Sequence, residues 1–282
     1  MRKIKEFLAF YLLRLATIII SFGLFLILFF IFKNGIKAIS LEFLTKPPIE
    51  AMTKGGIFPA IVGTFYLTLG ALIVAFPLGV GAAIYLSEYA RGGKVVHIIR
   101  IGINNLAGVP SVVFGLFGLA MFVVLFGFGS SILSGSLTLG LLILPVIIQT
   151  TEEALKTVSQ SYREASFALG ATKWQTIFKV VLPAAFPGVL TGAILGISRA
   201  AGETAPIMFT AAAFYTPGLP HSIFDEVMAL PYHIYVLATA GTHIEETRPI
   251  QYGTALVLIS LVLFFNAGAI FFRTRLRRRL GR

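Results

Sequence analysis

Residues 101–151 read IGINNLAGVPSVVFGLFGLAMFVVLFGFGSSILSGSLTLGLLILPVIIQTT, a run of 51 residues without a charged side chain. A helix that crosses the hydrocarbon layer needs about 20 mostly apolar residues, because its backbone groups must be hydrogen-bonded within the helix. The run is therefore too long for one crossing. Residues 127–131, GFGSS, are a turn-forming cluster that divides it, so the run predicts two membrane spans.

Four further charge-free runs bring the predicted number of spans to six. They lie at residues 15–32, 55–87, 180–198 and 249–272. The composition agrees, since 57% of the residues are hydrophobic and only 12% are charged, against about 25% charged in soluble domains. We therefore expect an all-α membrane protein. The first run is longer than the core of a signal peptide and no A-x-A site follows it, which favours a retained span.

The lysines and arginines are distributed unevenly between the segments that connect the spans. With six spans, seventeen of them fall on the side of the two termini and five on the other, while Arg199 stays in the membrane. By the positive-inside rule we expect both termini, including the basic tail 273–282, to be cytoplasmic. The net charge of +11 then requires no nucleic-acid partner. Residues 204–224 contain three prolines, so we expect a short continuation of the fifth helix and then an outer loop.

The predicted inner segment 152–179 carries helix-capping signals. The S-x-x-E pattern at residues 161–164 is typical of a capping box and predicts a helix that starts near Tyr162. Gly170 is placed to end this helix in the left-handed conformation, and the T-x-x-Q pattern at residues 172–175 repeats the box. Two short helices joined at a glycine are expected. Spacing alone leaves open whether they are simply an amphipathic connector lying on the membrane.

The same segment resembles the signature of ABC importer permeases, which reads E-A-A, three residues, G, nine residues, I-x-L-P. It is matched by Glu164, Ala165, Ser166, Gly170 and residues 180–183, with Ser166 in place of Ala and Val180 in place of Ile. The resemblance implies the MetI-like architecture of type I importers. It also implies that residues 162–178, Trp174 among them, form coupling helices that dock into a groove of a cytoplasmic ATPase.

The ATPase is expected to be a separate chain. No G-x-x-x-x-G-K-[ST] phosphate loop occurs in the sequence, and the nearest candidate, residues 92–95, lacks the first glycine and the hydroxyl residue. ATP and Mg²⁺ are therefore expected on the partner, with no cofactor on this chain. We expect a transporter subunit and not an enzyme.

Arg199 and Glu203 directly follow the fifth apolar run, where charge is costly and points to function. At about 100° per residue, both fall on a helix face that carries three glycines. These are Gly188, Gly192 and Gly196. Such a ridge lets another helix approach closely, so the pair should face protein or a pathway and not lipid. Two hypotheses stay open: a substrate-pathway pair beside a helix break at residues 202–206, or a structural ion pair that fixes helix packing.

The run 199–206, RAAGETAP, resembles the corresponding segment of phosphate-specific ABC permeases of the PstA type. Supporting segments are residues 77–81, 85–89, 107–111 and 114–119. The resemblance covers about residues 57–272, which we expect to be the permease core, between an N-terminal span with its outer loop (1–56) and the basic tail.

This resemblance implies inorganic phosphate as the substrate and places Arg199, Glu203 and Thr204 in its pathway. A guanidinium offers a planar fork of donors that fits two phosphate oxygens and stays charged in a poorly solvated site. Glu203 is suited to hold Arg199 when no anion is present and to accept the P–OH hydrogen bond that sulfate lacks. The alternatives are a permease for another oxyanion, such as sulfate or molybdate, a membrane-embedded enzyme, and a passive anion channel.

The expected partners follow from the same resemblance. They are a second, PstC-like permease, a dimer of PstB-like ATPases, a PstS-like extracytoplasmic phosphate-binding protein and the lipids of a prokaryotic cytoplasmic (inner) membrane. No metal site is expected, because the chain has no cysteine and His221, His233 and His243 match no ligand spacing. These histidines are predicted to be solvated residues of the outer loop.

Overall fold

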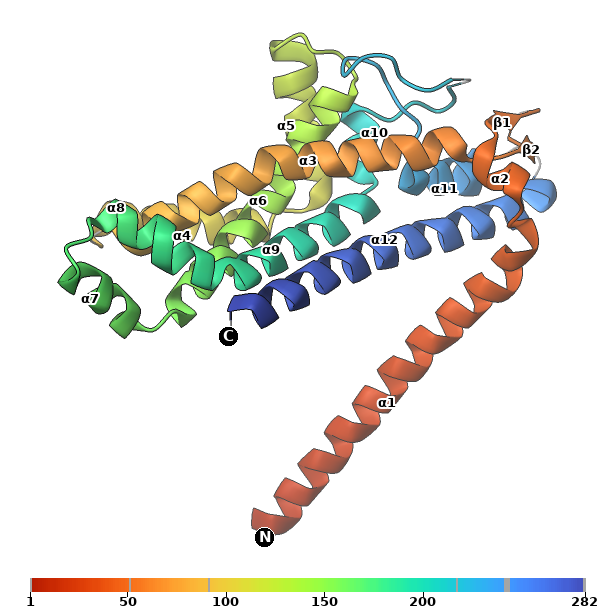
Figure 1. The fold of residues 1–282 in the computed structure, drawn as a ribbon. Helices are drawn as coiled ribbons and strands as arrows, with labels where there is room; N and C mark the ends of the chain where they lie inside the picture. The colour runs from red at the N-terminus through yellow and green to blue at the C-terminus, as the bar shows by residue number, and fades with distance from the viewer. Residues whose placement is uncertain (1, 51, 91, 217, 241–243, 281–282) are drawn as a thin grey trace.

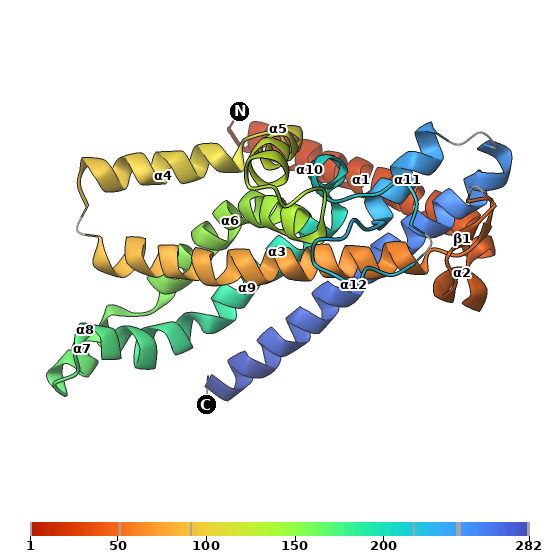
Figure 2. The ribbon, with the colours of Figure 1, turned by 90° about the horizontal axis from the view of Figure 1, so that it is seen from above.

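A computed structural model of the chain describes residues 2–50, 52–90, 92–216, 218–240 and 244–280. The described part is a bundle of helices with one small antiparallel hairpin (Figures 1 and 2). In chain order the elements are α1 (Arg2–Gly35), η1 (Ile36–Ala38), α2 (Leu41–Thr45), β1 (Pro48–Ile49), β2 (Lys54–Gly55), α3 (Phe58–Ile84), η2 (Tyr85–Tyr89), α4 (Lys94–Ala107), α5 (Ser111–Gly118), η3 (Leu119–Leu125), α6 (Ile132–Thr157), α7 (Gln160–Ala168), α8 (Lys173–Thr176), η4 (Ile177–Val181), α9 (Leu182–Gly202), α10 (Ala205–Thr210), α11 (Leu230–Thr239) and α12 (Ile244–Leu280). Of the η elements, η1 is a 3₁₀ turn and the other three are π turns.

Among the described residues, five helical stretches are long and apolar enough to cross a membrane. They are Phe10–Ala38, Phe58–Tyr89, Ile132–Thr157, Lys173–Gly202 and Thr247–Leu276. A sixth is a bent pair, in which α4 and the α5–η3 stretch meet at an angle of 103°. The expected all-α architecture with about six apolar helices is therefore confirmed.

The first half of the 101–151 run differs from the straight span that its composition predicts. It is bent between α4 and α5 because Pro110 has no N–H to donate and disfavours the helical conformation at Val109. The predicted turn after it is confirmed: Gly127 and Gly129 have φ angles of 70° and 68°. Ser131 then caps α6, its Oγ accepting a hydrogen bond from the N–H of Ser134 at 3.1 Å.

The core lies between α3, α6 and α9, and Figure 1 shows α3, α9 and α12 running side by side. Its buried members include Leu67 and Ala71 of α3, Leu139, Leu142, Ile143 and Ile147 of α6, and Ala200 of α9. Small residues bring the backbones close. A Cβ added at Gly192 would lie 2.2 Å from Oγ1 of Thr150, and one added at Gly188 would lie 2.5 Å from Cβ of Ala154. The glycine ridge of α9 therefore faces α6, where dispersion contact holds the two helices together.

A second apolar cluster lies at the end of the bundle that carries α2 and the β1–β2 hairpin. Oγ1 of Thr64 in α3 accepts a hydrogen bond from the N–H of Leu230 at 2.8 Å, which ties the start of α11 to α3. Beside it, Gly63 lies against the Met228 backbone, where an added Cβ would come within 2.0 Å of the carbonyl oxygen. The connection from α10 to α11 thus packs directly on α3.

The helix break expected at residues 202–206 is confirmed, but the prediction that the fifth helix continues into residues 204–224 is wrong. Glu203 follows the last turn of α9 with an extended backbone (φ −76°, ψ 129°), and α10 is a separate helix of six residues. Beyond α10 an isolated bridge joins Ala212 to Val227 before α11 begins. The break follows from two residues. Gly202 has a low helix propensity, and Pro206 has no N–H to donate inside a continuing helix.

The prediction of a solvated histidine is wrong for His233. Its side chain, in α11, is only 2% exposed and neither ring nitrogen has a hydrogen-bond partner. Burial lowers the pKa of His233 to about 4, because removal from water penalises the charged ring. His221 is exposed as predicted, and His243 lies outside the described residues. In the part of the chain that the structure describes, no group of three or more metal-ligating side chains comes together.

We predict that Gly63→Ala destabilises the fold and that Gly81→Ala, in the same helix, does not. The new methyl group at position 63 would meet a backbone oxygen that cannot rotate away, whereas nothing lies within 4 Å of a Cβ at position 81. Overpacking costs about 1–3 kcal/mol, and removing a glycine from a helix interior gains about 0.5–1 kcal/mol. Thermal unfolding in lipid nanodiscs measures both. Equal Tm values for the two variants would contradict the close α3–Met228 contact.

We also predict that His233→Leu makes the stability less sensitive to acid. The unfolded ring titrates near pH 6.5 and the folded one near pH 4. The unfolded chain therefore binds the proton first, so stability is lost as the pH falls below about 6.5, and the loss is complete below about 4. At pH 5 the loss relative to pH 7 is about 2 kcal/mol. Leucine fills a similar volume without titrating. Unfolding at pH 7 and pH 5 should show a smaller drop in the variant, and equal drops would contradict the buried ring.

Candidate functional site

The segment that carries the E-A-A-type signature forms two short helices at one end of the bundle. Ser159, and not Ser161, caps α7: its Oγ accepts from the N–H of Ser161 at 3.4 Å and lies 2.8 Å from that residue's hydroxyl. The predicted box at residues 161–164 is therefore wrong, and α7 starts at Gln160. Val158 ends α6 in an extended conformation, which makes the next residue the first one able to cap the new helix.

The junction after α7 matches the prediction. Gly170 has a φ of 79°, a conformation that costs glycine little, and the N–H of Ala171 donates to the carbonyl of Ser166 at 3.2 Å. The capping box of Thr172 and Gln175 forms in both directions. The second helix is not a separate rod, however. α8 continues through η4 into α9, so this half of the segment is the beginning of the 30-residue stretch Lys173–Gly202.

Some of the signature residues are buried and join the two helices, and others are exposed. Ser166, which stands where the signature has alanine, is buried and shares a hydrogen bond of 2.9 Å with the hydroxyl of Thr176, joining α7 to α8. Glu164 and Ala165 are exposed. So is Trp174, at 61%, and its ring lies against Phe178 in a tilted arrangement with centroids 3.9 Å apart.

Large apolar side chains gather around these exposed residues. Tyr162 is 59% exposed, Leu169 is 90% exposed and Phe167 is 46% exposed. Lipid-facing apolar residues need no explanation on a membrane span, but these lie on a connection between spans, next to the exposed charged residues Glu164 and Lys173. An apolar patch with a charged rim is typical of a protein-binding surface.

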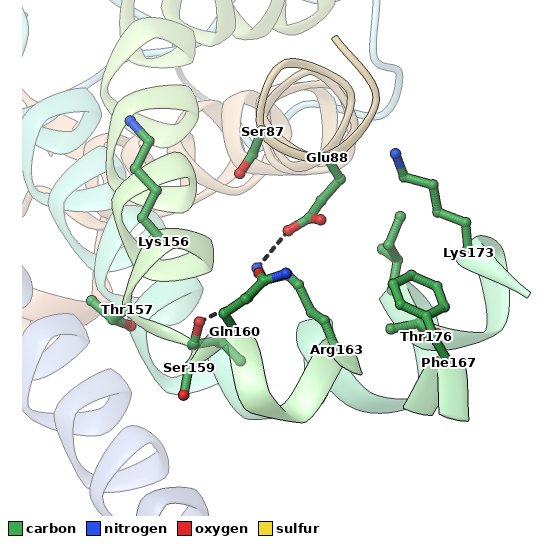
Figure 3. A pocket seen from close by; sticks show the side chains of 12 residues that line it. Ser87, Glu88, Lys156, Thr157, Ser159, Gln160, Arg163, Phe167, Lys173 and Thr176 are labelled. Carbon is green, nitrogen blue, oxygen red and sulfur yellow. Dashed lines mark hydrogen bonds and ion pairs between the residues drawn. The ribbon is translucent and has the colours of Figure 1, made fainter. Parts of the chain in front are cut away.

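Behind this surface lies a hollow of about 570 Å³ between η2, the end of α6, α7 and α8. Figure 3 shows Glu88 and Arg163 pointing toward each other across it, with Lys156 and Lys173 on either side. A nitrogen of the Arg163 guanidinium lies 2.7 Å from Oε1 of Glu88, and the two side chains are only 13% and 11% exposed. The guanidinium also donates to the carbonyls of Val158 and Leu155, at 2.7 and 3.1 Å.

Sequence reasoning missed this ion pair. Arg163 entered the prediction as an orienting charge and as a member of the 162–178 segment, and Glu88 as part of the 85–89 segment, with nothing that linked the two. The two residues are 75 positions apart, so no local pattern connects them. Removing one partner of such a shielded pair costs about 3–5 kcal/mol, because the other charge is left unpaired.

A second missed pair lies close by. Arg100 of α4 donates to Oε2 of Glu152 at 2.5 Å and to the carbonyl of Leu86 in η2 at 3.0 Å. Glu152 is 6% exposed, and the ammonium of Lys156 is 3.6 Å from the same carboxylate oxygen. Further along, the side-chain amide of Gln149 donates to Asn104 at 2.9 Å. α4 is thus attached to both η2 and α6 by polar contacts.

The predicted pair Arg199 and Glu203 comes together at the far end of α9. Nε of Arg199 lies 3.4 Å from Oε1 of Glu203, with side chains 33% and 18% exposed. The helical projection was wrong for Glu203, because α9 ends at Gly202 and the carboxylate reaches back from an extended residue. Thr204 follows at the start of α10, half-buried, and its side chain caps no helix.

The break at residues 203–204 lies near the bend at residues 108–110. Leu106 and Val109, on either side of that bend, pack against the core cluster that contains Ala200 of α9 and Ile207 of α10. Contact between α5 and α10 is close, since a Cβ added at Gly115 would lie 2.9 Å from the carbonyl oxygen of Ala205. Interrupted helices that meet in this way recur at the binding sites of transporters.

Residues 75–282 match the family described as "Binding-protein-dependent transport system inner membrane component". The chain is 36% identical to the probable ABC transporter permease protein YqgI of Bacillus subtilis (strain 168), over 99% of this chain and 98% of that relative. It is 40% identical to the phosphate transport system permease protein PstA of Mycobacterium leprae (strain TN), over 80% of this chain and 73% of that relative.

Among solved structures, the fold is similar to that of a chain of the MetNI methionine ABC transporter in an inward-facing conformation. The TM-score is 0.63 at 18% sequence identity, over 78% of this chain and 97% of that one. At this identity the likeness concerns the fold, and it confirms the MetI-like architecture. The resemblance to importer permeases of the PstA type is confirmed as well. The chain therefore belongs to the family of binding-protein-dependent transport system inner membrane components, and it is an integral membrane permease subunit of the ABC importer class.

Proposed function

We propose that this permease subunit moves inorganic phosphate into the cell, driven by ATP hydrolysis on a separate chain. The observation that carries the proposal is the Arg199–Glu203 pair, which lies at a helix break beside a second, bent pair of helices. The relationship to phosphate permeases of the PstA type supports the choice of anion.

The chemistry of the pair suits a partly hydrated oxyanion. The contact between Arg199 and Glu203 is long for an ion pair, at 3.4 Å, and the guanidinium is one-third exposed, so an arriving anion can compete for it without leaving a buried charge unpaired. A guanidinium binds two oxygens of a phosphate at once. The carboxylate released from Arg199 can then accept the P–OH hydrogen bond, and the hydroxyl of Thr204, the next residue, is proposed to donate another.

The exposed face of α7 and α8 is proposed to dock on the ATPase, which holds ATP and Mg²⁺. In this arrangement the α7–α8 end and both termini are cytoplasmic. A second, homologous permease completes the pathway, and an extracytoplasmic binding protein delivers phosphate to the opposite end. Closure of the ATPases moves the α7–α8 segment and opens the pathway outward, and hydrolysis returns it to the inward-facing state.

Two alternatives make different predictions. A permease for sulfate or molybdate would keep the ATPase dependence but would show no role for a P–OH acceptor at Glu203. A passive channel would keep transporting after the ATPase is inactivated. The exposed apolar face of the α7–α8 segment favours a docked partner over the channel, because an unpartnered patch would be costly in water.

We predict that Trp174→Ala weakens ATPase binding without unfolding the permease. Trp174 is 61% exposed, and a large aromatic side chain at the centre of an interface contributes about 2–4 kcal/mol, or roughly 30- to 1,000-fold in affinity. Binding of the purified ATPase to permease in nanodiscs measures the effect. Leu41→Ala, at an 80% exposed position of α2 near the opposite end, is the control. Unchanged ATPase affinity of Trp174→Ala would refute the docking surface.

We predict that Arg199→Lys lowers phosphate uptake by about 10- to 100-fold, because lysine keeps the charge but loses the fork. Glu203→Gln should reduce the preference for phosphate over sulfate in competition assays, because the amide gains N–H donors that bind a sulfate oxygen as well as a phosphate oxygen, whereas the carboxylate only accepts. Reconstituted vesicles containing the whole complex provide the measurement. Arg248→Lys, at a 53% exposed side chain, is the matched control. Wild-type uptake and selectivity in both pathway variants, with normal assembly, would refute the proposed site.

A further inference from the structure

The π turn η2, at the end of α3, is in contact with both halves of the α7–α8 segment. Glu88 pairs with Arg163 of α7 at 2.7 Å, and the ammonium of Lys173, at the start of α8, lies 5.0 Å from the centre of the Tyr89 ring. The first is a shielded, charge-assisted hydrogen bond and the second a cation–π contact. Two independent interactions therefore attach one five-residue turn to both short helices.

Arg163 is held in a fixed orientation. Its guanidinium binds the Glu88 carboxylate and the carbonyls of Leu155 and Val158, so it joins α7 to η2 and to the end of α6 at once. A planar fork that meets three acceptors has little freedom to rotate. A displacement of α7 must therefore move η2 with it or break a pair of largely buried charges.

The position of α4 relative to the same turn is fixed by a side chain and not by the short main-chain connection between them. The connection from η2 to α4 contains Gly92 and Gly93, with φ angles of 80° and 107° and no atom within 4 Å of an added Cβ. Glycines are conformationally permissive, so these two do not fix the position of α4 relative to η2. Arg100 provides the firm link, because it binds the carbonyl of Leu86 in η2 and the buried Glu152. α4 in turn leads to the bend that precedes α5.

We propose that η2 is the part of the membrane core that the α7–α8 segment moves, with Glu88–Arg163 and Arg100–Leu86 as the two links. Movement of the docked segment would pass through Glu88 into α3 and through Arg100 into α4 and the bent pair. Arg163 and Arg100 are positioning residues in this scheme and bind no substrate. The inference rests on the proposed docking of the α7–α8 segment to an ATPase, but not on the identity of the cargo.

The absence of cysteine from the sequence permits a direct test. In the assembled complex, Glu88→Cys with Arg163→Cys should lower phosphate uptake per ATP hydrolysed by at least about tenfold, because hydrolysis continues without the link. Joining the two thiols with a bifunctional maleimide of about 10 Å span should restore at least half of the coupling. A monofunctional maleimide should not. Full coupling before cross-linking, or no recovery after it, would overturn the proposal.

A second measurement needs neither cargo nor ATPase. Spin labels at Ser161 of α7 and Val95 of α4, both exposed, report how firmly the two helices are joined in the permease alone. Glu88→Gln and Arg163→Gln should broaden the distance distribution, whereas Glu153→Gln, a carboxylate on the exposed side of α6, should leave it unchanged. Distributions as narrow as wild type in the first two variants would overturn the proposal. If the wild-type complex transports no phosphate but the two permease variants show the broadened distributions, only the proposed cargo is refuted.

Discussion

Pairing of arginine with carboxylate inside a low-dielectric bundle is the interaction on which the functional part of this structure depends. Three such pairs occur among the described residues: Arg100–Glu152 joins the middle of α4 to α6, and Arg163–Glu88 and Arg199–Glu203 lie where helices end. A charge there is costly unless it is paired, so each pair fixes the relative placement of two elements. The distances separate their roles. Contacts of 2.5 and 2.7 Å in the first two are those of firm links, whereas 3.4 Å in the third is long for an ion pair, and the proposed phosphate site depends on that difference.

The pairs are useful only because the helices around them are held rigidly. In lipid, close approach of small residues takes the place of the hydrophobic effect as the cohesive force. α3, α6 and α9 achieve it with glycine against threonine and alanine, as at Gly192 and Gly188. The interruptions at residues 108–110 and 203–204 are both flanked by side chains of this core: Leu106 and Val109 at the first, Ala200 and Ile207 at the second.

Local patterns in the sequence predicted what depends on neighbours along the chain. Charge-free runs located the spans, the GFGSS cluster located the turn before α6, and Gly170 with the Thr172–Gln175 box located the junction of α7 and α8. Where two local signals compete, the pattern fails. Ser159 and Ser161 can both cap, and the end of α6 at Val158 decides in favour of the first. Counting apolar residues also overlooked the bend at Pro110, since hydropathy carries no information on a missing donor.

Contacts between distant residues lie beyond any such pattern. Glu88 and Arg163 are 75 positions apart. His233 lies in the charge-free, mostly apolar run 227–240, which is too short to cross a membrane and therefore falls in the predicted outer loop. The continuity of α8, η4 and α9 is a related case, because capping signals at residue 172 predict where a helix starts and not how far it runs.

That continuity has a mechanical consequence for the proposed cycle. A stretch of 30 residues from Lys173 to Gly202 spans about 45 Å at 1.5 Å per residue. It has the exposed Trp174 near one end and the Arg199–Glu203 pair at the other. A tilt imposed on α8 therefore reaches the candidate phosphate site through a continuous helical stretch, while α7 acts on α3 and α4 through η2. In the proposed cycle the two halves of the segment thus have separate connections, α8 to the Arg199–Glu203 pair and α7 to α3 and α4. The Ser166–Thr176 hydrogen bond, which joins α7 to α8, is what makes them move together.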